Sequence, residues 1–248
     1  MKFIFASDFD KTIYFRDGFH KEDMEAIKVF QKEGNLFGLC TGRSLYGIEE
    51  TMKEDFPFDF YLLATGCYLL DKNKIPFFTC ELEKREIKRL IEEYGDIYSY
   101  AINTGKDYVM VKDYYGIFYN LSPFPEGQKY YGMSFYCPKT ALASEVKGKI
   151  EKEHLGLTAH QNGRYIDITV KGISKGSSIQ KLREIYPDAF IFGIGDNFND
   201  LPLLEEVDCS FTFESSNEGV KERADYIVSS LKDAISIANE IIKKKSLL

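Results

Sequence analysis

Short apolar runs alternate with amphipathic segments over the first 64 residues. Phe3–Ser7 is an apolar run that ends at a polar residue, and Leu36–Thr41 repeats this pattern. Between them, Lys21–Glu33 carries apolar residues at helical spacing and is followed by a glycine. Ser44–Lys53 also has a helical pattern, and Asp59–Ala64 is a third apolar run. Strands that alternate with helices at this spacing predict a doubly wound α/β fold with a parallel sheet.

The same rhythm returns near the end of the chain. Ser174–Tyr186 has the pattern of an amphipathic helix, and Ala189–Ile194 that of a buried strand. The remaining elements that we expect there are a short helix at Asp200–Glu206, strands at Cys209–Phe213 and Tyr226–Val228, and a closing helix at Leu231–Lys245. Both ends of the chain are therefore predicted to build one Rossmann-like core.

The middle of the chain has a different pattern, with 11 of the 17 tyrosines lying between residues 81 and 170. The elements expected there are helices at Leu82–Tyr94 and Ala141–Glu153 and strands at Ile97–Asn103, Tyr108–Lys112, Tyr130–Cys137 and Arg164–Val170. This pattern favours an α+β insert with an antiparallel sheet. We expect residues 1–80 and 171–248 to form the core, and most insert tyrosines to pack within the insert's own sheet.

Composition narrows the classes of partner. The formal net charge of −7 argues against nucleic acid or an anionic membrane, because either favours a basic face. The apolar runs are too short to span a bilayer, and Met1-Lys2 leads directly into a strand rather than a signal peptide. The five cysteines are widely spaced, which favours buried free thiols and a cytoplasmic location. The sequence leaves the oligomeric state open between monomer and dimer.

Two carboxylates, Asp8 and Asp10, directly follow the first predicted strand. Residues two apart share one face of an extended chain. Open α/β sheets bind ligands beyond the carboxyl ends of their strands, and two close carboxylates repel each other unless a cation or a shared proton relieves them. The pair therefore indicates a Mg²⁺ site in which one carboxylate attacks or carries protons. The alternative is a solvated turn.

Three further motifs follow predicted strands or begin predicted helices. Thr41–Ser44 offers a hydroxyl, a glycine and free helix N–H groups that would hold a phosphate, although a plain glycine turn with a serine cap also fits. Within it, Arg43 suits either an anion contact or a structural salt bridge. Lys175 begins a helix, where a cation is unfavourable unless an anion lies beside it. Gly193–Asp200 adds two carboxylates and an amide after an apolar strand.

In order and placement, these four motifs resemble those of the haloacid dehalogenase-like (HAD) hydrolase superfamily. The layout is similar to its Cof-type branch, with a large cap of the C2 type, subtype B, between the second and third motifs. The resemblance covers essentially the whole chain. Two departures are Lys11, where the family usually has glycine, and Thr65–Cys67, where relatives commonly have Asn-Gly-Ala.

The resemblance implies a role for each acidic residue of the motifs. Asp8 would be the nucleophile and Asp10 the general acid and base. Asp196 would bind Mg²⁺ together with Asp8 and the backbone carbonyl of Asp10. Asp200 would act from outside the metal's own ligands, by orienting its water shell or the lysine.

The resemblance also implies a phosphate site. Thr41, Gly42, Lys175 and Asn199 would bind the transferring phosphoryl group. The reaction implied is Mg²⁺-dependent hydrolysis of a small phosphorylated metabolite, with a sugar phosphate as the favoured class, through an aspartyl-phosphate. The alternatives are a phosphomutase of sugar phosphates and a non-catalytic phosphoacceptor module.

Overall fold

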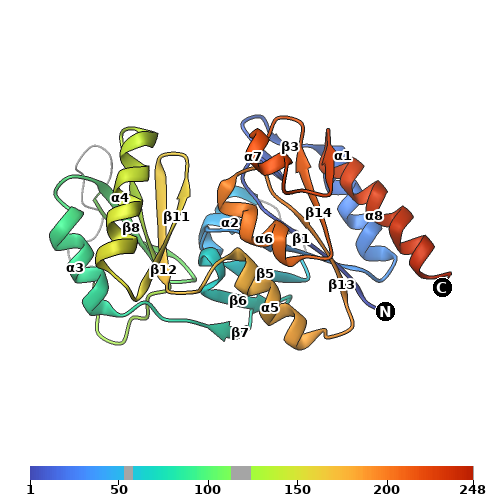
Figure 1. The fold of residues 1–248 in the computed structure, drawn as a ribbon. Coiled ribbons are helices and arrows are strands. Elements are labelled where there is room, and N and C mark those ends of the chain that lie inside the picture. Colours follow the sequence, from blue (N-terminus) through green and yellow to red (C-terminus); the bar gives the residue numbers. More distant parts are fainter. Residues whose placement is uncertain (53–57, 113–123, 248) are drawn as a thin grey trace.

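The computed structural model describes residues 1–52, 58–112 and 124–247. It has two separate sheets, with the core on the right of Figure 1 and the insert on the left. Both termini lie at the end of the core that is remote from the insert (Figure 1). The described helices include none that is both long and apolar enough to cross a bilayer.

The core sheet has eight strands in the order β15-β14-β13-β1-β4-β5-β6-β7. Six of them are parallel: β1 (Phe3–Ser7), β4 (Leu36–Cys40), β5 (Phe60–Leu63), β13 (Phe190–Ile194), β14 (Cys209–Phe213) and β15 (Tyr226–Val228). These six confirm the predicted doubly wound α/β fold. The antiparallel strands β6 (Tyr68–Asp71) and β7 (Pro76–Thr79) extend the sheet and were not predicted.

Helices cover both faces of this sheet because its strands are apolar on both sides. Phe5 and its neighbours pack toward α1 (Lys21–Lys32) and α8 (Leu231–Lys245). Ile4 and Ala6 pack on the opposite face toward α5 (Lys175–Ile185) and α6 (Leu201–Glu206). The shorter elements are α2 (Leu45–Met52), α7 (Glu218–Lys221), the 3₁₀ turns η1 (Ala64–Gly66) and η2 (Phe198–Asp200), and the hairpin of β2 (Tyr14–Phe15) and β3 (Gly18–Phe19).

The insert contains a five-stranded antiparallel sheet in the order β11-β12-β10-β8-β9. Its elements are α3 (Lys84–Tyr94), β8 (Ser99–Asn103), β9 (Tyr108–Lys112), β10 (Gly132–Tyr136), α4 (Thr140–Glu153), β11 (Leu157–Asn162) and β12 (Tyr165–Val170). The prediction missed β11, in which the alternation of apolar and polar residues stops at three consecutive polar residues, His160–Asn162. The four predicted strands and both predicted helices are present.

The insert's sheet has one apolar face and one polar face. Ile166 and Ile168 of β12 belong to the apolar cluster that includes residues of α3 and α4. Asp167 lies between them in sequence and therefore projects from the other face, opposite Ser134 on β10. That polar face is turned toward the core.

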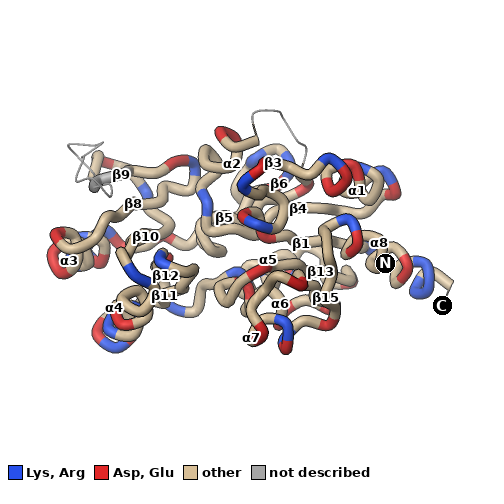
Figure 2. The backbone as a smooth tube through the Cα atoms, turned by 90° about the horizontal axis from the view of Figure 1, so that it is seen from above, with Lys and Arg blue, Asp and Glu red and all other residues tan. Residues whose placement is uncertain are grey.

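Charged side chains are mixed along the outer helices. Figure 2 shows basic and acidic residues close together along α1, α4 and α8. All five cysteines are free; Cys80 is partly exposed and the other four are buried. The predicted buried thiols are thus found at four of the five positions.

Candidate active site

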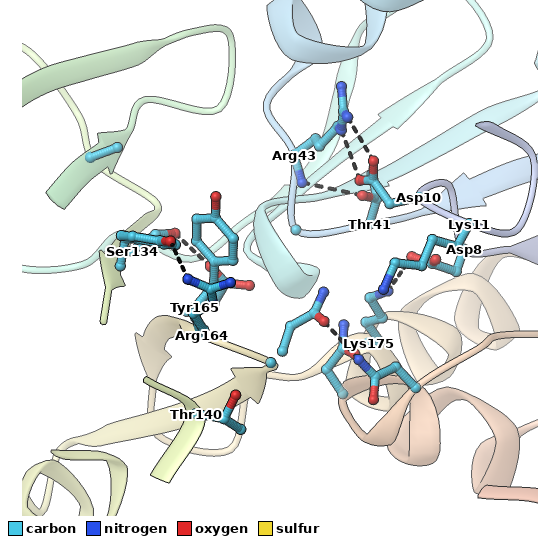
Figure 3. A pocket seen from close by; sticks show the side chains of 18 of the residues that line it. Asp8, Asp10, Lys11, Thr41, Arg43, Ser134, Thr140, Arg164, Tyr165 and Lys175 are labelled. Atoms are coloured by element: carbon cyan, nitrogen blue, oxygen red, sulfur yellow. Dashed lines mark hydrogen bonds and ion pairs between the residues drawn. The ribbon is translucent and has the colours of Figure 1, made fainter. Parts of the chain in front are cut away.

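The sheet order brings the four sequence motifs to one edge of the core. Strand β1 lies between β13 and β4, so Asp8 lies beside the polar ends of both neighbours. Asp8, Asp10, Thr41 and Lys175 all line one cavity of about 730 Å³ between the core and the insert. Figure 3 shows these side chains projecting into this space from the core side.

A buried ion cluster lies at the base of this cavity. Lys175 Nζ donates to Asp8 Oδ1 at 2.5 Å and also to Asp200 Oδ1. The Lys175 side chain is only 1% exposed. Burial lowers the pKa of its ammonium, but Asp200 and Asp8 outweigh burial and raise it well above the usual value. The two carboxylates are the anions that a lysine in the first turn of a helix requires.

Three carboxylates meet at the same place. Oxygen atoms of Asp8, Asp196 and Asp200 all lie within 4.8 Å of one another. Burial and the charge of Asp200 raise the pKa of Asp8 to about 8 and that of Asp196 to about 6. These raised pKa values reflect burial first and repulsion from Asp200 second, and a bound cation would offset both. An all-oxygen ligand set is the kind that Mg²⁺ prefers, so the donors fit that ion.

Asp200 also shapes the loop that carries Asp196. Its Oδ2 accepts hydrogen bonds from the backbone N–H groups of Asp196 and Asn197, each at 3.1 Å. A side chain at Gly195 would place its Cβ 2.4 Å from the Cβ of Asp200, so the close approach requires glycine. With both oxygens engaged, Asp200 holds the loop and Lys175 in position.

Asp10 is held by an arginine from the second motif. Arg43 Nη2 donates to Asp10 Oδ1 at 2.6 Å and Arg43 Nε to Oδ2 at 2.8 Å. The same guanidinium donates to the Gly47 carbonyl and to Thr51 Oγ1, both on α2. Of the two interpretations left open for Arg43, the structure shows the salt bridge. The geometry is bidentate, which fixes the orientation of the carboxylate.

Lys11 lies at the mouth of the same cavity. Its φ is 61°, in the left-handed region that glycine adopts most easily. The chain therefore retains a strained backbone at the position where the family usually has glycine, and gains an exposed cation there. The ammonium of Lys11 acts against the rise in the pKa of Asp196.

The helix that follows Thr41–Ser44 does not offer free N–H groups. Ser44 N donates to the Tyr108 hydroxyl at 2.9 Å, Leu45 N to the Gly105 carbonyl at 2.9 Å and Tyr46 N to the Lys106 carbonyl at 2.8 Å. The expectation that these groups would hold a phosphate is therefore wrong. A loop of the insert caps the helix instead, an arrangement that local sequence patterns do not reveal.

Thr41 and Gly42 line the cavity that this loop helps to enclose, although Thr41 is otherwise buried. Thr41 Oγ1 accepts from Arg43 N at 3.3 Å and keeps its hydroxyl proton for another acceptor. A Cβ at Gly42 would lie 3.0 Å from Asp167 Oδ2, so the insert approaches the core closely at this glycine.

Asn199 also lines the cavity, on η2. Its Oδ1 is buried and has no hydrogen-bond partner among the described residues. Only its amide nitrogen is able to donate to a phosphate oxygen. Its predicted role in phosphate binding stays a prediction.

The insert supplies residues that the sequence analysis did not name. They are Tyr108, Ser134, Tyr136, Arg164, Tyr165 and Asp167, all of which line the cavity. Figure 3 shows Ser134, Arg164 and Tyr165 on the side opposite Asp10 and Thr41. The signal that would have found several of them is strand alternation, because Tyr165 and Asp167 alternate with isoleucines along β12. The other insert tyrosines at 94, 98, 100, 130 and 131 are buried in apolar clusters, whereas those at 114, 115 and 119 lie outside the described residues.

The sequence model of the haloacid dehalogenase-like hydrolase family matches residues 5–241. The chain belongs to this family. Its membership confirms the resemblance drawn from the four motifs and the prediction of a hydrolase. The match spans both halves of the core and the whole insert.

Individual relatives are distant. A Streptococcus pyogenes serotype M6 protein, provisionally named a bifunctional phosphatase/peptidyl-prolyl cis-trans isomerase, is 24% identical over 246 residues, covering 91% of this chain and 50% of that protein. The chain thus spans about half the length of that relative. The phosphoglycolate phosphatase of Sulfolobus acidocaldarius is 24% identical over 232 residues, covering 91% of this HAD chain and 89% of that protein. The HAD subclass IIB sugar phosphatase BT4131 has a similar fold, with a TM-score of 0.75 and 17% identity over 98% of this chain and 99% of its own.

Proposed function

We propose that this HAD hydrolase is a Mg²⁺-dependent phosphatase that hydrolyses a small phosphorylated metabolite, a sugar phosphate, through an aspartyl-phosphate on Asp8. The observation that carries the proposal is the position of Asp8. It lies in a buried ion cluster with Lys175 and at the edge of a cavity that Asp10 also lines. The names of the phosphatases among its relatives are consistent with this reaction.

Five residues that line the cavity would each have a separate role in this reaction. Asp8 attacks phosphorus, while Lys175 and the hydroxyl of Thr41 offset charge on the phosphoryl oxygens. Asp10 gives a proton to the departing alcohol and later takes one from the water that hydrolyses the intermediate. Arg43 keeps the Asp10 carboxylate facing the cavity through its two hydrogen bonds.

Asp8, Asp196 and the backbone carbonyl of Asp10 would hold Mg²⁺, which supplies charge stabilisation to the phosphoryl group when bound. Asp200 supports this site through Lys175 and the backbone of the loop. Because Lys175 offsets only part of the repulsion among the three carboxylates, the same residues also give the ion its affinity.

Residues 81–170 would act as a cap over a core formed by residues 1–80 and 171–248. The two separate sheets and apolar clusters support this division. A closed cap excludes bulk water from the phosphoryl group and contacts the leaving group. Tyrosine rings and hydroxyls on its polar face suit a polyhydroxylated leaving group.

A substrate panel with and without Mg²⁺ tests the proposal directly. In Asp8→Asn, phosphate release should fall about 10⁴-fold or more, because removing a nucleophile disables the whole catalytic unit. Asp17→Asn is the control, since Asp17 is an exposed carboxylate on the β2–β3 turn. Full activity of Asp8→Asn, or full activity without a divalent ion, would contradict the mechanism. Phosphorus NMR would show isomerisation in place of phosphate release if the chain were a mutase.

A further inference from the structure

Asp167 is a carboxylate that faces a site built for an anion. It lies at the middle of β12, and its Oδ1 accepts a hydrogen bond from Ser134 Oγ at 2.5 Å. Its other oxygen is the atom nearest to a Cβ placed on Gly42. The side chain is half-buried between the two sheets. A further negative group so close to a phosphate site would repel an anionic substrate, so the position of Asp167 requires an explanation.

The position of Asp167 relative to the reacting groups is set by the register of the insert's sheet. Asp167 pairs with Ser134 on one side and with His160 on the other, so its side chain projects from the polar face. Burial raises the pKa of Asp167 above its usual value, and Ser134 and the charge of Lys175 offset only part of that rise. Asp10 also acts on it electrostatically. Asp167 lines the same cavity as Asp8 and Asp10, with its Oδ2 beside Gly42, so it lies close to where the leaving group of a substrate would be.

The hydrogen-bonding capacity of Asp167 limits what it will accept. An ionised carboxylate only accepts hydrogen bonds, so its partner must be a donor such as a hydroxyl. Tyr136 and Tyr165 line the same side of the cavity and present ring faces and further hydroxyls. Hydrogen-bonding groups flanked by aromatic rings are features of a site that binds a sugar or polyol.

We propose that Asp167 determines specificity by accepting a hydrogen bond from a hydroxyl of a neutral polyol leaving group and by repelling a leaving group that carries a second negative charge. This inference rests on the proposed phosphatase function and extends it to the choice of substrate. Lys11 and Arg164 would favour the opposite choice, but both are exposed at the rim of the cavity, and Arg164 already donates to the Tyr136 hydroxyl at 3.0 Å.

A pair of matched substrates isolates this effect. Glycerol 3-phosphate and 3-phosphoglycerate differ by the exchange of a terminal CH₂OH group for a carboxylate. The quantity to measure, with Mg²⁺ present, is the ratio of kcat/KM for the first compound to kcat/KM for the second. p-Nitrophenyl phosphate has neither group, so its hydrolysis reports on the core machinery alone.

In Asp167→Asn we expect the glycerol 3-phosphate/3-phosphoglycerate ratio to fall about 10-fold or more, because the variant removes the repulsion and keeps the shape. The rate of p-nitrophenyl phosphate hydrolysis should stay within about threefold of that of the unmodified chain, because this substrate has neither the hydroxyl nor the carboxylate on which Asp167 would act. Glu145→Gln is the matched control: it removes a carboxylate from the outer face of the insert, where Glu145 pairs with Lys149. This variant should leave the ratio unchanged.

An unchanged ratio in Asp167→Asn with p-nitrophenyl phosphate hydrolysis intact would overturn the inference, as would a preference of the unmodified chain for 3-phosphoglycerate. If Asp167→Asn does not fold, Ser134→Ala tests the same inference. Loss of the hydrogen-bond donor makes the ionised form of Asp167 less stable, so the ratio should fall several-fold. An unchanged ratio in Ser134→Ala would overturn the inference. Absence of Mg²⁺-dependent p-nitrophenyl phosphate hydrolysis by the unmodified chain would instead reject the proposed function.

Discussion

The two sides of the cavity are built on different principles. On the core side, full charges are held in ion pairs: Lys175 is buried with Asp8 and Asp200, and the partly exposed Asp10 is paired with Arg43. On the insert side, the lining is mostly hydroxyl groups and rings, with Asp167 as a half-buried acid among them. The first arrangement fixes a charge distribution, whereas the second offers hydrogen bonds that a ligand can complete.

This difference indicates that the core side would catalyse the reaction and the insert side would select the substrate. The core groups come from strand ends and a helix start that the parallel sheet holds together. The core contacts the insert through hydrogen bonds such as those from Ser44 N to the Tyr108 hydroxyl and from Asn197 Nδ2 to Asn162 Oδ1. Changes on the insert's polar face should therefore alter which substrate reacts, and changes in the core should alter whether any substrate reacts.

The largest effect is expected from Lys175→Met. Removing the lysine leaves two buried carboxylates without their cation, which should cost about 3–5 kcal/mol in the free energy of unfolding. Activity should fall about 10²–10³-fold on every substrate, since a preorganised charge is lost. Urea unfolding without Mg²⁺ measures the first effect. Lys181→Met on the same helix is the control, because Lys181 pairs with Glu184 and lies over the Phe78 ring, outside the buried ion cluster. Equal losses in both variants would contradict the argument.

Arg43→Gln should reduce turnover according to the leaving group. Asp10 would lose its bidentate partner, and proton transfer to an alkoxide should weaken by about 10²-fold. p-Nitrophenolate leaves without protonation, so p-nitrophenyl phosphate should lose less than about fivefold. Arg43→Lys keeps the charge without the two parallel hydrogen bonds, so its turnover should lie between that of the unmodified chain and that of Arg43→Gln. A uniform loss over all substrates would mean that Arg43 acts on the phosphoryl group instead.

Mg²⁺ affinity should depend on pH, because protons compete for the same carboxylates. The metal-free pKa of Asp8 is about 8 and that of Asp196 about 6. Affinity should therefore fall about tenfold per unit as pH drops from 8 to 6, and more steeply below 6. Because both pKa values are raised on folding, the metal-free protein should lose stability as pH rises from about 4 to 8.

Calorimetry in buffers of different ionisation enthalpy measures the protons released when Mg²⁺ binds. Asp196→Asn should remove the step near pH 6 and move the step near pH 8 to lower pH, because the charge of Asp196 helps to raise the pKa of Asp8. An affinity that is independent of pH would show that the carboxylates are ionised before the ion arrives.

The sequence predicted the core side well because its chemistry is compressed into short motifs at strand ends. Asp8, Asp10 and Lys175 each follow a strand or begin a helix, and the sheet order then brings them together. The insert side was predicted only as a fold class. Tyr108 contacts the start of α2, and Asp167 lies against Gly42. Both contacts depend on where the second sheet lies relative to the core, which no local sequence pattern determines.

The smallest effect is expected from Tyr108→Phe, which tests the junction between the two sides. The variant removes the hydrogen bond from Ser44 N to the phenol oxygen and leaves that N–H without its partner. One such bond contributes about 1 kcal/mol, so closure of the insert should weaken about fivefold. We expect this as a rise in KM for small substrates with kcat nearly unchanged, and as faster amide exchange at the start of α2. Tyr94→Phe removes a hydroxyl from the insert's own apolar cluster and serves as the control. If both variants raise KM equally, the effect lies in the insert's stability rather than in its docking on the core.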